Sequence, residues 1–295
     1  MGNFNKLGMV ATAALLLVVA GSTVSQAAYD SAELKCRSTI AKTFSKAIAT
    51  GQKSVVGCNK TRDKSGGAAD CNILDSGNAD PKGKFAKAQT KLTDGVTKAC
   101  ITSGIDGDVL SEYVSCPEPC STALALSNPL SSYADLGQCL ACVAGEIAQD
   151  FGSASQGLPG GVPLSTDDGK CHGAIGKFYG KYMSTIIKDR TKCQNAEEKK
   201  NGAMDLASTG CATSDLKGKI AGALTKAEAG LDKSCPAAVL ANLDSCAVTN
   251  LIDLKNCLKT DSDTAGDDGV SYAYEMPPTI CPIGVDSLVR GSQSV

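Results

Sequence analysis

The chain has 295 residues, of which 42% are hydrophobic but only 4% aromatic, and it contains no Trp. Its formal net charge of −2 at pH 7 shows neither the strongly basic balance of a nucleic-acid-binding protein nor an acidic tail. The core must be built from small aliphatic side chains that each bury little area, so covalent cross-links become valuable.

The first segment has the layout of a secretory signal peptide. Lys6 precedes an apolar run from Gly8 to Ala20, and small residues surround a cleavage site at Ala27. The run is too short to cross a bilayer, and no later stretch reaches the roughly 18 apolar residues of a transmembrane helix. We expect residues 1–27 to be removed and the mature protein to be periplasmic or extracellular, where its 15 cysteines form disulfides.

Two blocks of the chain occur twice. Residues 36–58 align with 171–193 at seven identities in 23 positions, and residues 82–100 align with 217–235 at ten in 19. Neither alignment needs a gap, and both share one offset, which matches Cys36 with Cys171 and Lys82 with Lys217. An internal duplication of this kind decides the architecture before any other signal does.

Both blocks have helical periodicity. Apolar residues such as Ile40 and Phe44 recur every four positions, and Gly- and Asp-rich loops separate the helices, with Pro81 and either Ser214 or Asp215 as helix-start residues. The alternation that strands need is absent. We predict an all-α fold of two tandem repeats, each an antiparallel helical hairpin followed by a shorter helical segment.

The cysteines at the two ends of a predicted helix cannot bond each other. Cys171 and Cys193 are separated by 22 residues, about 33 Å along a helix, whereas a disulfide needs Cα atoms within roughly 7 Å. Each must therefore bond across the hairpin. The expected bridges are Cys36–Cys100, Cys58–Cys71, Cys171–Cys235 and Cys193–Cys211.

The second part of the first repeat has two more cysteines than the second part of the second repeat, because Cys120 and Cys142 have no counterparts there. Two cysteines missing together are most simply one missing bridge. A nested pairing of Cys116 with Cys142 is the alternative. The expected bridges are Cys116–Cys139, Cys120–Cys142 and Cys246–Cys257.

Cys281 is left over. It lies among prolines in "YAYEMPPTICPIG", which excludes a helix interior. An odd cysteine in an exported protein indicates an intermolecular bridge or a free thiol. We favour a disulfide-linked homodimer, and a buried free thiol is the alternative.

Three segments are candidates for chemistry. His172 is the only histidine and follows the bridged Cys171, so a Cys–His nucleophile and histidine-based metal sites or triads are not expected; we interpret it as a solvated residue at a helix start. The segment "CLAC" (139–142) is a CxxC motif, which makes an extracytoplasmic thiol–disulfide enzyme the alternative function. Structural cystines are the favoured interpretation.

The third segment, residues 261–272, resembles part of an EF-hand loop. Asp261, Asp263 and Asp267 fall at positions 1, 3 and 7, but position 12 is Tyr272 instead of a bidentate Glu. This makes a weak calcium site, and with it a calcium-dependent adhesion module, a further alternative. A plain solvated loop is the default.

Lysines recur at spacings of four, seven and eleven, which keeps them on one face of a helix. Each hairpin therefore carries a basic stripe, which is either an ordinary solvated face or a contact surface for an anionic cell-surface polymer. The two stripes are Lys42, Lys46, Lys53, Lys84, Lys91 and Lys98, and Lys177, Lys181, Lys188, Lys219, Lys226 and Lys233.

At "GKFYGKYMSTIIKDRTKC", "KAEAGLDKSC" and "DLGQCLAC", the sequence resembles exported cysteine-rich helical repeat proteins of Gram-negative soil and sediment bacteria. The resemblance covers roughly residues 34–260 and supplies no catalytic residues. The chain departs from the pattern in the insertion "STALALSNPLSS" and in the missing second cysteine of the CLxC segment in repeat two.

We therefore predict two helical modules, residues 29–160 and 165–283, joined by the linker "GSASQGLPGGVPLSTDDG" and followed by a polar tail at 284–295. The predicted function is non-catalytic, in binding or surface structure, without a cofactor.

Overall fold

The computed structural model describes residues 30–67, 69–101, 108–157, 162–202 and 206–275, and this part of the chain is helical, without a β-strand. The prediction of an all-α fold is confirmed. The long helices are α1 (Ser31–Ser65), α2 (Lys84–Ile101), α5 (Tyr133–Gln156), α6 (Thr166–Asn201), α8 (Lys219–Ser234) and α10 (Leu251–Tyr274). The short ones are α3 (Asp108–Ser111), α4 (Cys120–Leu124), α7 (Leu206–Thr209), η1 (Cys211–Thr213), α9 (Ala237–Leu240) and η2 (Ser245–Ala247).

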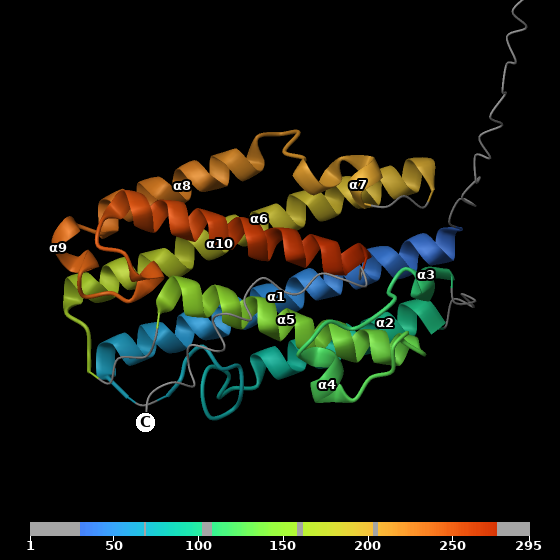
Figure 1. Ribbon diagram of the computed structural model, residues 1–295, viewed down its shortest axis with the longest axis horizontal. Helices are drawn as coiled ribbons and strands as arrows, with labels where there is room; N and C mark the ends of the chain where they lie inside the picture. Colours follow the sequence, from blue (N-terminus) through green and yellow to red (C-terminus); the bar gives the residue numbers. More distant parts are fainter. Residues whose placement is uncertain (1–29, 68, 102–107, 158–161, 203–205, 276–295) are drawn as a thin grey trace, which may run out of the picture.

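The long helices form two layers (Figure 1). Helices α8, α6, α1 and α2 lie side by side in that order, and we call them the four-helix layer. Helices α5 and α10 pack against each other and across the inner side of that layer, and we call them the two-helix layer. The core lies between the layers, so the outer side of the four-helix layer is left to solvent.

Carboxylates fix where α2 and α8 begin. The side chain of Asp80 accepts hydrogen bonds from three backbone N–H groups in the first turn of α2, at 2.7–3.0 Å. Asp215, which the alignment of the repeats matches with Asp80, accepts two in the first turn of α8, at 2.9 and 3.0 Å. The helices themselves begin at Lys84 and Lys219, a few residues after the start at Pro81 or Asp215 that the sequence indicated.

The core is one continuous cluster with contributions from both halves of the chain. Phe44 of α1 and Tyr179 of α6 are fully buried in it, beside Leu140 of α5 and Leu258 of α10. Close approach of the helices compensates for the small number of aromatic side chains. At Gly269 of α10, for example, an added Cβ would lie 2.8 Å from a side-chain carbon of Ile187 on α6.

A buried ion pair and a buried His–Asp contact join α1 to α6 along what we call the central seam. Arg37, near the start of α1, lies 2.7 Å from Glu198, near the end of α6. His172, near the start of α6, lies 2.7 Å from Asp63, near the end of α1. The two helices are therefore antiparallel. The alignment of the repeats matches Arg37 with His172 and Asp63 with Glu198. The two pairs are therefore reciprocal: each joins the same two positions of the repeat, with the two halves of the chain exchanged.

Seven disulfides hold the helices and their connections together, with Cα–Cα distances of 4.6 to 6.2 Å. They coincide with the pairs expected from the sequence. Bridges of this number indicate an oxidising compartment reached by export. The pairs are Cys36–Cys100, Cys58–Cys71, Cys116–Cys139, Cys120–Cys142, Cys171–Cys235, Cys193–Cys211 and Cys246–Cys257.

Several predicted boundaries were wrong. Helices α1 and α6 extend well beyond the cysteines that marked their predicted ends, because polar residues continue each helix to a glycine C-cap, Gly66 and Gly202. The segments predicted to be shorter are the 24-residue helices α5 and α10, which are longer than α2 and α8. The linker is also shorter than predicted, since α5 continues to Gln156 and α6 begins at Thr166.

Candidate functional site

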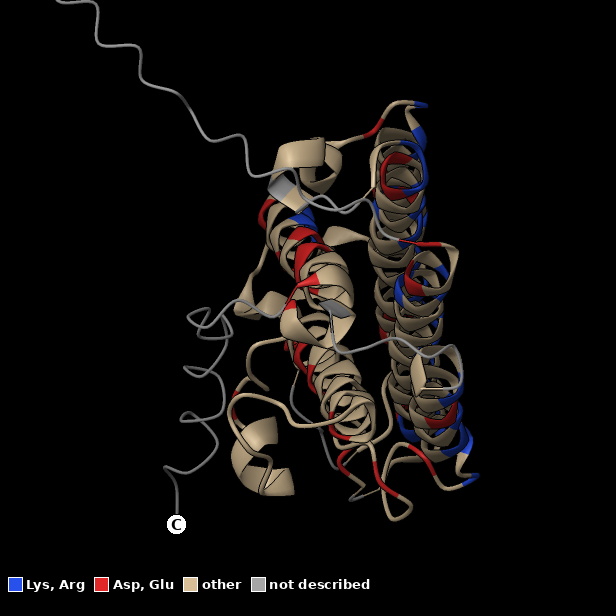
Figure 2. Cartoon of the chain, turned by 90° about the vertical axis from the view of Figure 1, so that its right-hand side faces the viewer, with Lys and Arg blue, Asp and Glu red and all other residues tan. Residues whose placement is uncertain are grey.

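The lysines that the sequence placed on helical stripes are exposed on the four-helix layer. Figure 2 shows Lys and Arg gathered on this layer, mostly along its outer side, while the two-helix layer is mostly acidic. Helices α1, α2, α6 and α8 carry 23 Lys and Arg against 10 Asp and Glu. Helices α5 and α10 carry two against eight. The near-neutral net charge of the chain therefore hides a strong separation of charge.

The helical spacing and the core together position this basic face. One side of α1 is buried against the two-helix layer through residues such as Phe44 and Ile48, so Lys42, Lys46 and Lys53 are left on exposed positions. These three ammonium groups form no ion pair with the carboxylates of the described residues. Their positive charge is therefore available to an external anion.

On the two-helix layer, three partly buried carboxylates lie near one another. Burial, and then the charges of Glu146 and Asp268, raise the pKa of Asp150 to about 7. Burial raises the pKa of Asp268 to about 6 and also raises that of Glu146. No pattern in the sequence pointed to this cluster, because α5 and α10 come together only in the folded chain.

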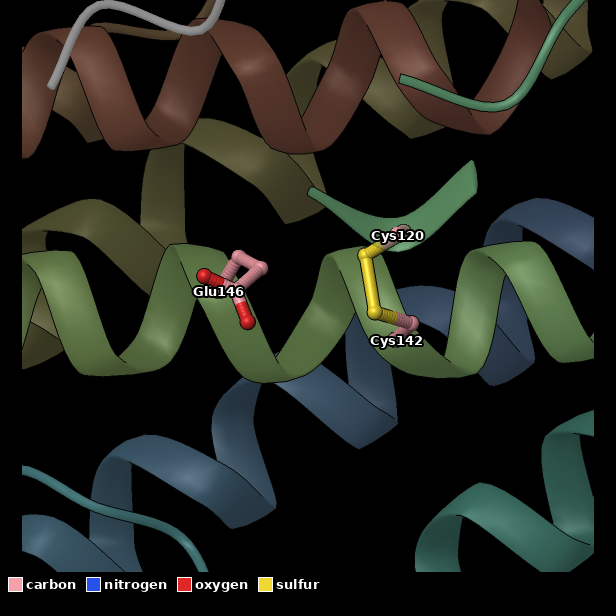
Figure 3. Close-up of side chains that lie close together, drawn as sticks. All are labelled: Cys120, Cys142 and Glu146. Carbon is pink, nitrogen blue, oxygen red and sulfur yellow. A yellow bond between two sulfur atoms is a disulfide. The ribbon is translucent and has the colours of Figure 1, made fainter. Parts of the chain in front are cut away.

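The two cysteines of the CLAC segment belong to different disulfides. Cys139 is bonded to Cys116 and Cys142 to Cys120, so the two cysteines of the motif are not bonded to each other. Thiol–disulfide exchange by a CxxC motif uses a bond within the motif. Figure 3 shows Glu146 one turn along α5 from the Cys120–Cys142 bridge.

Two groups of side chains have a metal-like composition, but in both the sulfurs are already bonded to each other. One is the Cys120–Cys142 bridge with Glu146, and the other is the Cys246–Cys257 bridge with Asp261. A disulfide sulfur is not the thiolate that binds zinc. Asp261 Oδ2 lies 3.3 Å from Cys257 Sγ, and burial raises the pKa of this carboxyl group.

The predicted calcium loop is wrong, because residues 261–272 continue α10 without a break. Asp263 accepts a hydrogen bond from Tyr182 Oη at 2.5 Å and one from Lys259 Nζ at 2.5 Å. Asp267 pairs with Arg190 of α6. The three candidate ligands Asp261, Asp263 and Asp267 thus have separate neighbours and do not form an EF-hand geometry.

The prediction that His172 is solvated is wrong, because only 3% of its surface is exposed. Its Nδ1 lies 2.7 Å from a carboxylate oxygen of Asp63, and its Nε2 lies 2.9 Å from the backbone oxygen of Gln156. The neighbouring Cys171 is bonded to Cys235, so no thiolate is present for a Cys–His pair. The ring connects α1, α5 and α6.

The buried charges of the central seam were missed from the sequence, although a signal existed. Arg37 and His172 occupy matched positions directly after Cys36 and Cys171. A charged or polar residue repeated beside a buried cysteine can be expected to enter the interior with a partner. That partner lies 161 residues away for Arg37, beyond the range of any local pattern.

Some predictions fall outside the described residues. They are the signal peptide at 1–27, Cys281 and the tail at 284–295. Among the helices that are described, none has the length and apolar character needed to span a membrane.

Comparison with known proteins gave no relative: no protein-family model, curated protein or solved structure matches the chain.

Proposed function

We propose that this chain is a non-catalytic, exported binding protein whose four-helix layer contacts an anionic cell-surface polymer. The separation of charge between the two layers carries the proposal, because it turns a chain of near-zero net charge into one with a basic face. Exposed lysines on a broad face attract a polyanion over roughly a Debye length, about 8–10 Å near physiological salt.

The architecture that we propose with this function is a tandem duplication. Each repeat is an antiparallel hairpin, α1 with α2 and α6 with α8, followed by a helix of the two-helix layer. The matched bridges Cys36–Cys100 and Cys171–Cys235, which have the same sequence separation of 64, support it. So do the reciprocal contacts of the central seam, Arg37–Glu198 and His172–Asp63.

The route of export and the oligomeric state belong to the same proposal. Residues 1–27 serve as a cleaved signal peptide, and the protein is periplasmic or extracellular. Cys281 links two copies into a homodimer, since the seven bridges use the other fourteen cysteines. Non-reducing electrophoresis of exported protein tests this, and a monomer band that takes up a maleimide label without unfolding contradicts it.

Binding to an immobilised acidic polysaccharide, polygalacturonate, tests the basic face. We expect the mature protein to be retained at about 0.05 M salt and released by about 0.5 M, where screening shortens the reach of the charges. The variant Lys42→Gln/Lys46→Gln should elute at lower salt than the wild type.

A matched control separates the basic face from total charge. Lys255→Gln/Lys259→Gln removes two lysines with the same four-residue spacing from the two-helix layer. We expect its elution to stay close to that of the wild type. Equal shifts for both double variants, or no retention at low salt, would exclude the proposed face.

A further inference from the structure

A cavity of about 490 Å³ opens beside the C-terminal half of α1. Its walls come from α1, from the segment after α1 that contains Cys71, and from the start of α2. This volume lies within the range of small-molecule sites, about 300–1,000 Å³. Two lysines of the predicted stripes, Lys53 and Lys84, are among its lining residues, but the cavity itself is not part of the proposed polymer contact.

The cavity is lined by more positive than negative side chains. Lys53, Arg62, Lys82 and Lys84 contribute to the wall, whereas Asp80 is the one acidic residue among the described lining residues. The oxygens of Asp80 already accept three backbone hydrogen bonds from α2. Asp80 therefore compensates the cationic groups little. Burial lowers the pKa of Arg62, and the charges of Asp63 and Asp70 act in the opposite direction, so this cation is partly balanced from outside the wall.

Arg62 has a donor without a partner. Its side chain is only 6% exposed, and its Nη1 is buried and forms no hydrogen bond. The Nη2 atom lies 3.9 Å from Asp63, whose other carboxylate oxygen is held by His172. A buried donor left unsatisfied is energetically unfavourable. A planar guanidinium satisfies such donors best with the two oxygens of a phosphate or carboxylate.

Hydroxyl groups complete the wall. Thr50, Thr61 and Ser65 line the cavity and donate their protons to backbone oxygens of α1 at 2.7, 3.1 and 3.0 Å. Their oxygens keep lone pairs that can accept from a ligand. Gly57, also in the wall, leaves open space, since an added Cβ there would meet no atom within 4 Å.

The matched positions in the second half of the chain lack these features. The alignment of the repeats matches Arg62 with Glu197 and Gly57 with Lys192. Lys219, the match of Lys84, lies 3.3 Å from Asp189 and is neutralised by it. The matched positions in the second half of the chain therefore serve as an internal control for the cationic cavity of the first half.

We propose that this cavity binds a phosphorylated sugar, with the phosphate beside Arg62, Lys53 and Lys84 and the sugar hydroxyls donating to Thr50, Thr61 and Ser65. The three lysines of the wall, Lys53, Lys82 and Lys84, form no ion pair among the described residues and together with Arg62 favour a dianion over a monoanion. The volume exceeds that of a phosphate ion alone and accommodates a sugar ring. Lys53 and Lys84 belong to both the cavity wall and the basic face, but the two proposals are tested with different ligands and different variants, so either can fail without the other.

Isothermal titration calorimetry with glucose 6-phosphate tests the site, with inorganic phosphate, glucuronate and glucose as comparisons. We expect glucose 6-phosphate to bind more tightly than the other three ligands. Arg62→Gln should weaken binding at least about tenfold. Gly57→Leu should weaken it similarly by filling the cavity, and it should fold normally because its added side chain enters open space.

Lys219→Gln is the matched control, and its affinity should stay within about twofold of the wild type because Lys219 is not among the residues that line the cavity. Circular dichroism melting establishes that each variant is folded. Absence of binding, or loss of affinity in Lys219→Gln equal to that in Gly57→Leu, overturns the site. Inorganic phosphate binding as tightly as glucose 6-phosphate overturns the sugar, and glucuronate binding as tightly overturns the phosphate.

Discussion

Arg37 and Glu198 are tolerated in the interior because they satisfy each other. Arg37 Nε and Nη2 donate to Glu198 Oε1 at 3.0 and 2.7 Å, and Gln194 donates to the same oxygen at 3.0 Å. The guanidinium also lies 5.5 Å from the ring centre of Tyr274. Buried pairs of this kind are costly to break because the remaining charge has no partner.

We therefore predict that Arg37→Met lowers the free energy of unfolding by about 3–5 kcal/mol. The double variant Arg37→Met/Glu198→Gln should lose clearly less than the single variant, since no uncompensated carboxylate stays in the core. Urea denaturation of the two variants and of Glu198→Gln gives the double-mutant cycle. Additive losses would contradict the coupling.

The carboxyl group of Asp150 makes stability depend on pH. Its pKa is about 7 in the folded protein, above the ordinary value of 3.8, so the folded state holds a proton that the unfolded chain has released. Stability should consequently fall as the pH rises from about 4 to about 7. Asp268, with a pKa of about 6, acts in the same direction.

Replacing Asp150 by Asn should flatten this pH dependence by on the order of 1–2 kcal/mol, a discounted figure for a partly exposed group. Denaturant titrations at pH 4, 5.5 and 7 measure the effect. An unchanged slope in Asp150→Asn would show that other groups cause the dependence.

At the scale of single elements, the starts of α2 and α8 provide a matched pair. Asp80 accepts three backbone hydrogen bonds and Asp215 accepts two. We predict that Asp80→Ala lowers the free energy of unfolding by about 1–2 kcal/mol and that Asp215→Ala lowers it by less. Chemical denaturation measures both, and the reverse order would contradict the role assigned to the extra bond.

The same elements show what the sequence could and could not predict. The helical class followed from the spacing of residues such as Ile40 and Phe44. The four hairpin bridges followed from the constant offset of the repeats combined with helix length, and the other three from the pair of cysteines missing in the second repeat. The sequence did not predict that residues 261–272 would be helical, because Gly266 and Gly269 look like turn residues in isolation. In α10 they lie where Ile186 and Ile187 of α6 come too close for a larger side chain.

The buried polar residues and the candidate binding sites could not be predicted in full, because they depend on contacts between residues that are far apart in the sequence. The partner of His172 lies 109 residues away and that of Arg37 lies 161 residues away. Periodicity could place the lysines on stripes. It could not show that both stripes would lie in one layer, because that depends on how α1 and α6 meet at the central seam.

For the whole molecule, the seam predicts that the two halves unfold together. The interpretation as two tandem modules would leave the second half untouched by a change in the first. The core instead includes residues of both halves in one cluster. The double variant Cys58→Ser/Cys71→Ser removes the disulfide between two cysteines with a sequence separation of 13. Its loss should lower the free energy of unfolding by roughly 3 kcal/mol.

We predict that this double variant lowers the stability of both halves equally, with one unfolding transition. Hydrogen exchange read at amides of α1 and of α8 distinguishes the cases. Lost protection in α1 with unchanged protection in α8 would show independent modules.

The reciprocity of the seam also bears on how such a chain could have arisen. A first half taken alone carries Arg37 near one end of α1 and Asp63 near the other. Placed antiparallel to a second copy of itself, it would bring Arg37 to Asp63 twice, an isologous contact with twofold symmetry. On the proposed duplication, the present chain corresponds to a fused dimer. Fusion would free the two copies of every position to diverge, and Arg62 at the cavity, matched by Glu197, is one position where their charges differ.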